Sequence, residues 1–536
     1  MMNQTPGQKK HVVLALPAPS PQELLPATSQ LLTEGGDARI TLDVQSGLNK
    51  YGCAPLPDAG MIALGSSTAS IISPRGFAAA DNLRTRLLHA PASSDYDLYA
   101  AELNRTRREL LSLCEISEGS GVDVVFAASG TDIHLIAAQA FSSGEKLQPL
   151  VIMVEANETG SGVAAALAGR HFSTHSALGE AFVSGADIPQ AAAIEVVSVA
   201  LRDANGMARA DAAIDADFEA LASPAAQAGR RVLIILIDGS KTGAIAPSTE
   251  CVLQLQQRYA GRIDVMVDAC QFRIASSTLR AYLQRDFMVA LTGSKFATGP
   301  TFSGALLIPP LCARRMRRHP IPPALRAYSS RADWPLDWEA AGSLKQAANF
   351  GMLLRWEAAL AEMRAFRALT DEQISGFLAA FGSAVQEKLH DSPLLDALPL
   401  PSLDRTGLTN GETWDHLPSI HPFLLFYPNT AKGRSALNRD QTLRVYQLLQ
   451  VDLSTRKMFG NDKFINHLAA MRCQLGQPVA CGHRDGVPVS ALRVCASMRM
   501  ITQACADNGK QAPALIEQAT SAIAKAELLA RVLHKI

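Results

Sequence analysis

The sequence lacks an excess of either charge and any long apolar run. Its 50 basic residues are matched by 50 acidic residues, so it has no electropositive footprint of the kind that binds nucleic acid. The apolar stretch VVLALPAP (12–19) is too short for a membrane span or a secretory signal and is interrupted by proline, and no longer run follows. We therefore expect neither nucleic acid nor a membrane as a partner.

Cysteine is too scattered to build a scaffold. The chain has nine cysteines, an odd number, and they lie far apart in the sequence. Such spacing does not suit a disulfide framework and fits a reducing compartment. We expect a cytoplasmic protein, and no pattern of metal ligands leads us to expect a metal centre.

The length of 536 residues exceeds that of one ordinary compact domain, and hydrophobic residues at 48% can supply more than one core. We expect a Pro-rich N-terminal extension with a short helix (1–36), a large domain (37–330) and a smaller C-terminal α+β domain (331–536). Long helical patterns between 340 and 392 begin the smaller domain.

Helical patterns alternate with short apolar runs between residues 95 and 310. Amphipathic spacing predicts helices at 99–113 and 132–141. The apolar runs lack alternation, which is typical of strands covered on both faces by helices. They lie at 121–129, 150–156, 232–238, 264–269, 287–292 and 304–309. The predicted fold class is α/β, a three-layer α/β/α sandwich with a mainly parallel sheet.

Polar motifs follow four of these strands, at the ends where α/β folds keep their ligand sites. Ser129-Gly130-Thr131 lies between a strand and a helix, where small residues and the helix N-terminus suit a phosphate. Asp268 closes another strand, with Gln271 just beyond, and either holds a protonated ring nitrogen or caps a helix.

The other two motifs contain lysine. Thr292-Gly293-Ser294-Lys295 follows the apolar run FMVALT and precedes a Gly-Pro turn, which favours a confined amine able to form a Schiff base over a surface charge. The polar turn DGSKTGAIAP (238–247) ends the strand VLIILID and by itself is an ordinary connection between a strand and a helix.

The order and placement of these motifs resemble the fold-type I pyridoxal 5'-phosphate (PLP) enzymes, in the branch of class V aminotransferases and cysteine desulfurases. That family holds phosphate on a Ser-Gly-Thr loop, meets the pyridine ring with Asp-Ala-x-Gln, and supplies its Schiff-base lysine before Gly-Pro and Gly-Ala-Leu. The matching stretches here are Ser129-Gly130-Thr131, Asp268-Ala269-Cys270-Gln271, Thr292-Gly293-Ser294-Lys295, Gly299-Pro300 and Gly304-Ala305-Leu306.

The resemblance implies PLP as cofactor, Lys295 and Asp268 as catalytic residues, and a homodimer. ALRVCAS (491–497) is similar to the family's Leu-Arg-x-Ser segment. This similarity implies that Arg493 binds the carboxylate of an amino-acid substrate; the alternative is that Arg493 forms a surface ion pair. The residues expected to bind the cofactor are Ser129, Gly130, Thr131, Thr159, Ser240, Asp268, Gln271, Thr292, Ser294 and Lys295.

The sequence departs from the family at two places. The family's Asn-Glu-Thr-Gly turn is replaced by Ser240-Lys241-Thr242-Gly243, and its ring-stacking histidine by VEANETGSG (154–162), which leaves Glu158 or Thr159 in that place. His171 and His175 follow and are expected at the surface. Tyr51 and Ser67 are the N-terminal candidates for the pocket, and the basic run RRMRR (314–318) is expected to be a solvated connection or a subunit contact.

The resemblance implies a PLP-dependent enzyme that acts at the α-carbon of an amino acid, and amino transfer is the favoured reaction, with Lys295 as proton carrier. A cysteine desulfurase or β-eliminating C–S lyase is the alternative. In that case Cys481, in GQPVACGHRDGVPVS (476–490), supplies the thiol unless it is a buried small hydrophobe. Epimerase and decarboxylase chemistry and a degenerate, non-enzymatic member of the fold complete the alternatives.

Overall fold

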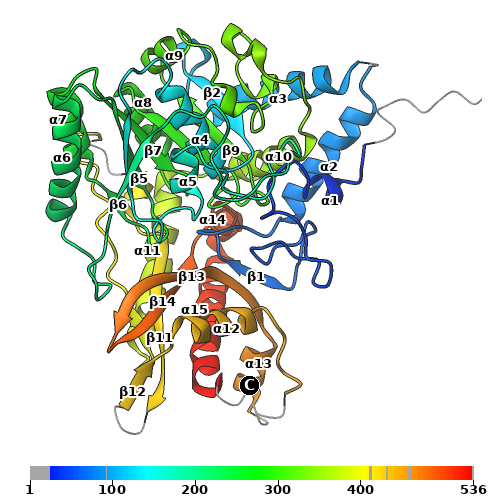
Figure 1. Cartoon of the computed structure of the whole chain (residues 1–536). Helices are drawn as coiled ribbons and strands as arrows, with labels where there is room; N and C mark the ends of the chain where they lie inside the picture. The colour runs from blue at the N-terminus through cyan, green and yellow to red at the C-terminus, as the bar shows by residue number, and fades with distance from the viewer. Residues whose placement is uncertain (1–24, 92, 410–412, 430–432, 457–461, 534–536) are drawn as a thin grey trace, which may run out of the picture.

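The computed structural model describes residues 25–91, 93–409, 413–429, 433–456 and 462–533. The apolar stretch 12–19 lies outside these residues. Two sheets organise the chain: a larger one in the upper part of Figure 1 and a smaller one, formed largely by the C-terminal region, in the lower part.

The larger sheet has eight strands in the order β2-β9-β8-β7-β5-β3-β4, with β6 paired to β5. The pairs β3/β4, β3/β5, β5/β7 and β7/β8 are parallel, whereas β9 runs antiparallel to both β2 and β8. The strands are β2 (Asp123–Ala127), β3 (Leu150–Val154), β4 (Glu195–Val199), β5 (Val232–Asp238), β6 (Ile245–Ala246), β7 (Ile263–Ala269), β8 (Met288–Thr292) and β9 (Gly304–Ile308). All six predicted strands are confirmed, and β4 is an additional edge strand.

Helices cover both faces of this sheet, because alternate residues of its buried strands enter two different apolar clusters. Val265 and Val267 pack on one side and Met266 packs on the other. The first side is covered by α3 (Asp95–Leu113), α6 (Asp211–Gln227), α7 (Thr249–Arg258), α8 (Ser276–Gln284) and α10 (Phe350–Phe366). The second is covered by α4 (Gly130–Phe141), α5 (Val163–Leu167) and α9 (Pro310–Met316). The predicted three-layer α/β/α architecture is confirmed.

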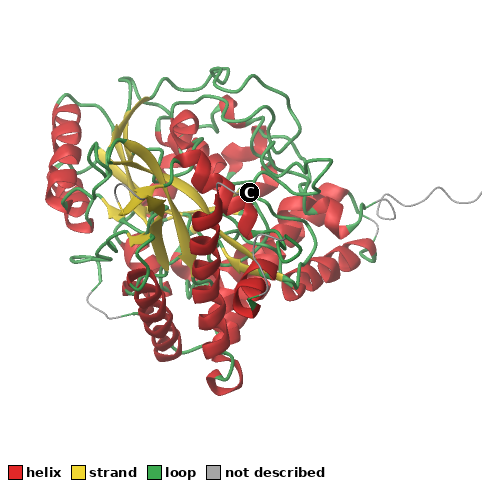
Figure 2. Cartoon of the chain, turned by 90° about the horizontal axis from the view of Figure 1, so that it is seen from below, coloured by secondary structure: helices red, strands yellow, loops and turns green. Residues whose placement is uncertain are grey.

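The smaller sheet has the order β1-β13-β14-β11-β10, with β12 paired to β11. Its strands are β1 (Met61–Leu64), β10 (Leu395–Ala397), β11 (Ile420–Asn429), β12 (Gly433–Ala436), β13 (Arg472–Arg484) and β14 (Val487–Cys495). The helices of this region are α11 (Asp371–His390), α12 (Arg439–Leu449), α13 (Lys463–Ala470), α14 (Met498–Cys505) and α15 (Ala512–Val532). Figure 2 views the molecule from this end, with helices around the central strands.

Two N-terminal elements cross the expected domain boundaries. β1 lies parallel to β13 in the smaller sheet, although it comes early in the chain. α1 (Thr28–Leu31), the short helix expected in the extension, packs with α2 (Pro74–Leu88) and α10. The boundaries at 36/37 and 330/331 therefore stay a prediction.

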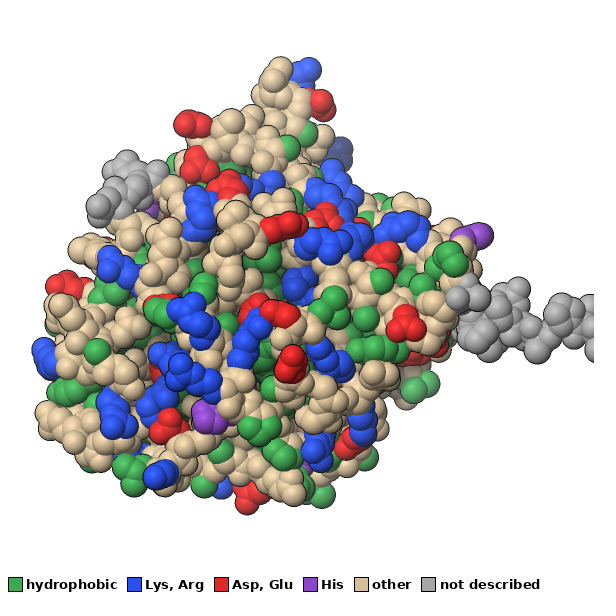
Figure 3. All heavy atoms as spheres, turned by 90° about the horizontal axis from the view of Figure 1, so that it is seen from above, with side chains coloured by type: hydrophobic (Ala, Val, Ile, Leu, Met, Phe, Trp, Pro, Cys, Tyr) green, Lys and Arg blue, Asp and Glu red, His purple; other side chains and the backbone are tan. Residues whose placement is uncertain are grey.

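The basic run at 314–318 is partly neutralised by acidic side chains, two of which lie on the larger sheet. Arg315 pairs with Asp264, and Arg317 pairs with Asp123 and Asp337. On the face that Figure 3 shows, basic and acidic side chains are intermingled. Within the described ranges no helix has the length and apolarity to cross a bilayer, and no group of three or more His, Cys, Asp or Glu is arranged to hold a metal ion.

Candidate active site

The carboxyl ends of β2, β3, β5, β7 and β8 meet at one edge of the larger sheet, because these strands run in the same direction. The loops that follow them surround a cavity of about 200 Å³. The predicted residues that line it are Ser129, Gly130, Thr131, Thr159, Asp268, Gln271, Thr292, Ser294, Lys295 and Arg493, together with the candidates Tyr51 and Ser67. Ser240 is the predicted residue that does not line it.

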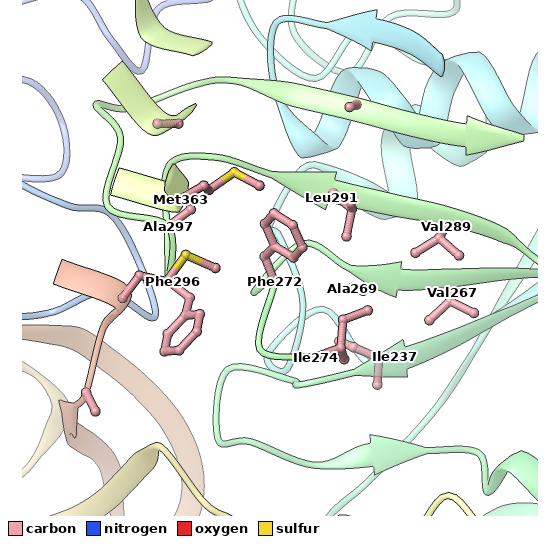
Figure 4. Packing of buried hydrophobic residues seen from close by; sticks show 14 of the residues in the cluster. Ile237, Val267, Ala269, Phe272, Ile274, Val289, Leu291, Phe296, Ala297 and Met363 are labelled. Carbon is pink, nitrogen blue, oxygen red and sulfur yellow. The ribbon is translucent and has the colours of Figure 1, made fainter. Parts of the chain in front are cut away.

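The loop that carries Lys295 packs tightly against α10. A β-carbon on Gly293 would lie 2.6 Å from Ala359 Cβ, and one on Gly299 would lie 2.7 Å from the same atom. Beyond the lysine, Phe296 packs among buried apolar side chains (Figure 4). Its ring stacks on Trp414 at a centroid distance of 5.5 Å. The small residues and the aromatic anchor together hold the loop in place, so that Lys295 lies at the cavity wall.

Asp268 lies at the end of β7, almost fully buried. Its Oδ2 accepts a hydrogen bond from Thr159 Oγ1 at 3.0 Å, and its Oδ1 accepts one from the Cys270 amide at 3.1 Å. Burial opposes ionisation, but His134 and Lys295 hold the pKa of the Asp268 carboxyl well below its usual range. The cavity therefore contains a buried carboxylate that is ionised at neutral pH.

His134, on α4, lies beside this carboxylate. Its Nε2 lies 3.4 Å from Asp268 Oδ2, and its Nδ1 lies 2.7 Å from the Gly130 carbonyl oxygen. The imidazole of His134 thus lies directly beside Asp268, and Thr159, in the loop after β3, donates a hydrogen bond to the same carboxylate.

The N-terminus of α4 forms one end of the cavity. Ser129 caps the helix, since its Oγ accepts from the amides of Thr131 and Asp132 at 3.2 and 3.3 Å. A β-carbon on Gly130 would lie 2.9 Å from Cys270 Sγ, so glycine allows the helix end to approach the cavity closely. The hydroxyls of Ser129 and Thr131 and the helix dipole make this end suited to an anion.

Arg39 adds a guanidinium to the same end. Its Nη1 donates to Thr131 Oγ1 and its Nη2 donates to Ser129 Oγ, each at 3.2 Å. Asp37 fixes the guanidinium through hydrogen bonds to Nε and Nη2. Burial and the nearby Asp37 raise the pKa of Asp132 to about 7, so the Asp132 carboxyl is only partly ionised near neutrality.

Arg493 lies on β14 and reaches the cavity from the smaller sheet. Its side chain is 1% exposed, and it donates to the Lys241 carbonyl at 3.1 Å, to Thr68 Oγ1 at 2.9 Å and to the Gln477 carbonyl. Its Nε is buried without a hydrogen-bond partner among the described residues. Over the same residues, no carboxylate oxygen lies within 4 Å of the guanidinium. A buried, unpaired arginine of this kind is suited to a carboxylate ligand.

In the turn after β5, the neighbouring residues Ser240 and Lys241 have different surroundings. Ser240 Oγ donates to Glu158 Oε2 at 2.7 Å, and Glu158 also accepts from Thr242 and pairs with Arg202 at 3.1 Å. Lys241, in contrast, lines the cavity. Burial, with Arg493 and Lys295 nearby, lowers the pKa of Lys241 to about 8.

Expectations from the sequence also concern the burial of His171, His175 and Cys481. The expectation that His171 lies at the surface is wrong: it is 5% exposed, its Nδ1 lies 2.6 Å from the Tyr328 hydroxyl, and its ring stacks on Phe182. His175 is partly exposed. Cys481 is fully buried in an apolar cluster with Leu424 and Val479, and burial raises the pKa of its thiol.

Sequence reasoning did not identify Arg39, His134 or the side chain of Lys241 as parts of the site. His134 left one signal, since it is a titratable residue in a helix that is otherwise mostly apolar (DIHLIAAQAF). Arg39 lies in a loop 90 residues before Ser129, and its position depends on tertiary structure.

No model of a known protein family matches the chain, and no curated protein matches its sequence. Among solved structures, the cystine C–S lyase C-DES in complex with its product cysteine persulfide is 14% identical, with a TM-score of 0.50 over 86% of this chain and 98% of that chain. A C-DES variant with glycine covalently linked to its PLP cofactor is 14% identical, with a TM-score of 0.49 over 87% and 99%. The cysteine desulfurase CsdA from Escherichia coli is 14% identical, with a TM-score of 0.49 over 88% and 95%.

The similarity at a TM-score of 0.50 shows the fold. The chain has the architecture of the fold-type I PLP enzymes, as the motifs predicted.

Proposed function

We propose that the protein is a PLP-dependent enzyme that acts at the α-carbon of an amino acid. The observation that carries the proposal is the convergence of Lys295 and the ionised Asp268 on one cavity that ends at the N-terminus of α4. Lysine, buried carboxylate and helix N-terminus match, in turn, the aldehyde, the ring nitrogen and the phosphate of PLP.

The residues present fit this cofactor. Ser129, Gly130 and Thr131 would hold the phosphate with Arg39, and Asp268 would hold the proton on the ring nitrogen. Bound PLP supplies an electron-withdrawing ring that stabilises negative charge at the substrate α-carbon. His134 keeps Asp268 ionised for this role.

The remaining chemistry falls to the chain's own groups. Arg493, which lines the cavity without a carboxylate partner among the described residues, would orient the substrate by its carboxylate. Lys295 Nζ, at the cavity wall, would take up the proton of the substrate α-carbon and act as the proton carrier of the reaction. The reaction that we propose is amino transfer.

The cysteines favour amino transfer over sulfur transfer to a protein thiol. Cys481 does not line the cavity, and of the nine cysteines only Cys270 does. Burial and the nearby Asp268 raise the pKa of Cys270 well above its usual range, which disfavours the nucleophilic thiolate. Elimination from a thiol-containing substrate needs no protein thiol. The PLP-loaded protein should therefore be incubated with single amino acids and scored for keto acid against sulfide or pyruvate. The proposal of amino transfer requires keto acid.

Arg493→Ala should weaken the binding of every amino-acid substrate by roughly 2–5 kcal/mol, because the substrate carboxylate loses its charged partner in a buried site. Cys481→Ser is the matched control, since its side chain is also buried on the smaller sheet but lies outside the cavity. Steady-state kinetics measure both variants. Loss of turnover in Cys481→Ser with normal cofactor loading would favour the desulfurase alternative instead.

Arg39→Gln should weaken PLP binding by about 10- to 100-fold, the worth of a hydrogen bond to a charged group. Pyridoxal, which lacks the phosphate, should bind both proteins alike. Absorbance titration of the cofactor-free protein measures both affinities. Arg39→Gln leaves the Asp37 carboxylate without its partner. The Asp37→Asn/Arg39→Gln double variant removes this carboxylate as well and so serves as a control. An equal loss for pyridoxal and PLP would contradict a phosphate contact.

We also propose a homodimer, as the resemblance to PLP enzymes of this fold implies. Ten large apolar side chains are exposed among the described residues, including Val44 and Val183 at 99% and 75%, which leaves apolar surface for a subunit contact. Light scattering measures the assembly state.

A further inference from the structure

The cavity has more basic than acidic groups. The basic residues that line it are Arg39, Lys50, Lys241, Lys295 and Arg493, and the acidic ones are Glu158 and Asp268. Both acidic residues have other neighbours, since Glu158 pairs with Arg202 and Asp268 lies beside His134. Among the described residues, neither carboxylate lies within 4 Å of a lysine ammonium.

Three of the basic groups have assigned partners or roles. Arg39 pairs with Asp37, Lys295 is the proposed cofactor lysine, and Arg493 is the proposed site for the substrate α-carboxylate. Lys50 and Lys241 are left over, and among the described residues no carboxylate oxygen lies within 4 Å of either ammonium. Lys50 is exposed, so solvent screens its charge.

Lys241 is the more deeply placed of the two. It is partly buried, its Nζ donates a long hydrogen bond of 3.4 Å to the Ala156 carbonyl, and its own carbonyl accepts from Arg493 Nη1 at 3.1 Å. The backbone contact places it directly beside the arginine that would hold the α-carboxylate. Two other cations, Arg493 and Lys295, lie near the Lys241 ammonium, so an anionic ligand that reaches it would be stabilised by electrostatic attraction.

We propose that the substrate is an amino acid with a second acidic group, held by Lys241 while Arg493 holds the α-carboxylate. This inference rests on the proposed function for the role of Arg493. It assigns Lys241 as the residue that selects acidic over neutral side chains.

The test compares dicarboxylates with monocarboxylates of equal carbon number, succinate with butyrate and glutarate with valerate. Calorimetry with the PLP-loaded protein measures each affinity. We expect the dicarboxylates to bind about 10- to 100-fold more tightly, the worth of one charge-assisted contact. Lys241→Met removes the ammonium but keeps the backbone contacts to Arg493 and Glu158, and it should bring the ratio close to one.

Lys146→Met is the control, because Lys146 is an exposed lysine outside the cavity and should leave the ratio unchanged. Lys241→Gln replaces Lys241→Met if the latter does not fold, as judged by circular dichroism. A ratio near one in the unaltered protein, or a high ratio that persists without the Lys241 ammonium, would overturn the inference. PLP loading, read by absorbance, is scored separately. Protein that does not load overturns the proposed function, and the same calorimetry on the unloaded protein then decides the role of Lys241 by itself.

Discussion

Lys295→Ala is expected to lower amino-acid turnover by at least about 10²- to 10⁴-fold, the usual contribution of one positioned acid–base group. The change removes the proton carrier and the covalent anchor of the cofactor together. PLP should still bind without a covalent bond, because the contacts at the N-terminus of α4 and at Asp268 remain. Turnover assays and the absorbance of the loaded protein measure the two effects.

Lys146→Ala serves as the control for Lys295→Ala, since it removes an exposed lysine outside the cavity. Near-normal turnover in Lys295→Ala would show that another amine carries out its role. Lys241 would then be the first candidate, because it lines the same cavity and its lowered pKa leaves part of its amine neutral near pH 8.

Asp268→Asn should reduce turnover by roughly 10²- to 10⁴-fold, from about 3–5 kcal/mol for the loss of one partner of a buried charged pair. A neutral amide cannot keep the ring nitrogen protonated as a carboxylate does, so the cofactor withdraws electrons less strongly. PLP affinity should fall less than the rate does, since the phosphate contacts are intact. Steady-state kinetics and cofactor titration of the same preparation measure the two quantities.

His134→Gln is a second variant to compare with Asp268→Asn. It removes the imidazole beside Asp268 but leaves the carboxylate, so its loss of turnover should be smaller than that of Asp268→Asn. An Asp268→Asn enzyme with near-normal turnover would contradict the role of Asp268.

The buried strands were predictable because they are short apolar runs between turns, and β5 occupies the same residues as the predicted strand at 232–238. β4 was not predicted, since its sequence EVVSV is partly exposed at the sheet edge and is not a continuous apolar run. β1 joins the smaller sheet through a pairing more than 400 residues away in sequence, which no local pattern encodes.

The site shows the same division between local and distant contacts. Ser129, Asp268 and Lys295 were predictable because each lies at or just after the end of a strand of the same sheet, and parallel strand ends meet. Ser240 satisfied the same rule, yet its hydroxyl donates to Glu158 and it does not line the cavity. Arg39 and Arg493 come from outside the larger sheet. The contacts of Arg39 with Ser129 and Thr131 were not visible in the sequence, whereas Arg493 was identified through its resemblance to a family motif.

The most direct test of the central claim is to load the protein with PLP, reduce it with borohydride and map the labelled peptide. Reduction fixes the cofactor to the amine that holds it, and Lys50, Lys241 and Lys295 all line the cavity. The account predicts a single pyridoxyl group, on the peptide that contains Gly293-Ser294-Lys295. A label on Lys241 or on any other lysine, or protein that remains unlabelled after loading, would contradict it.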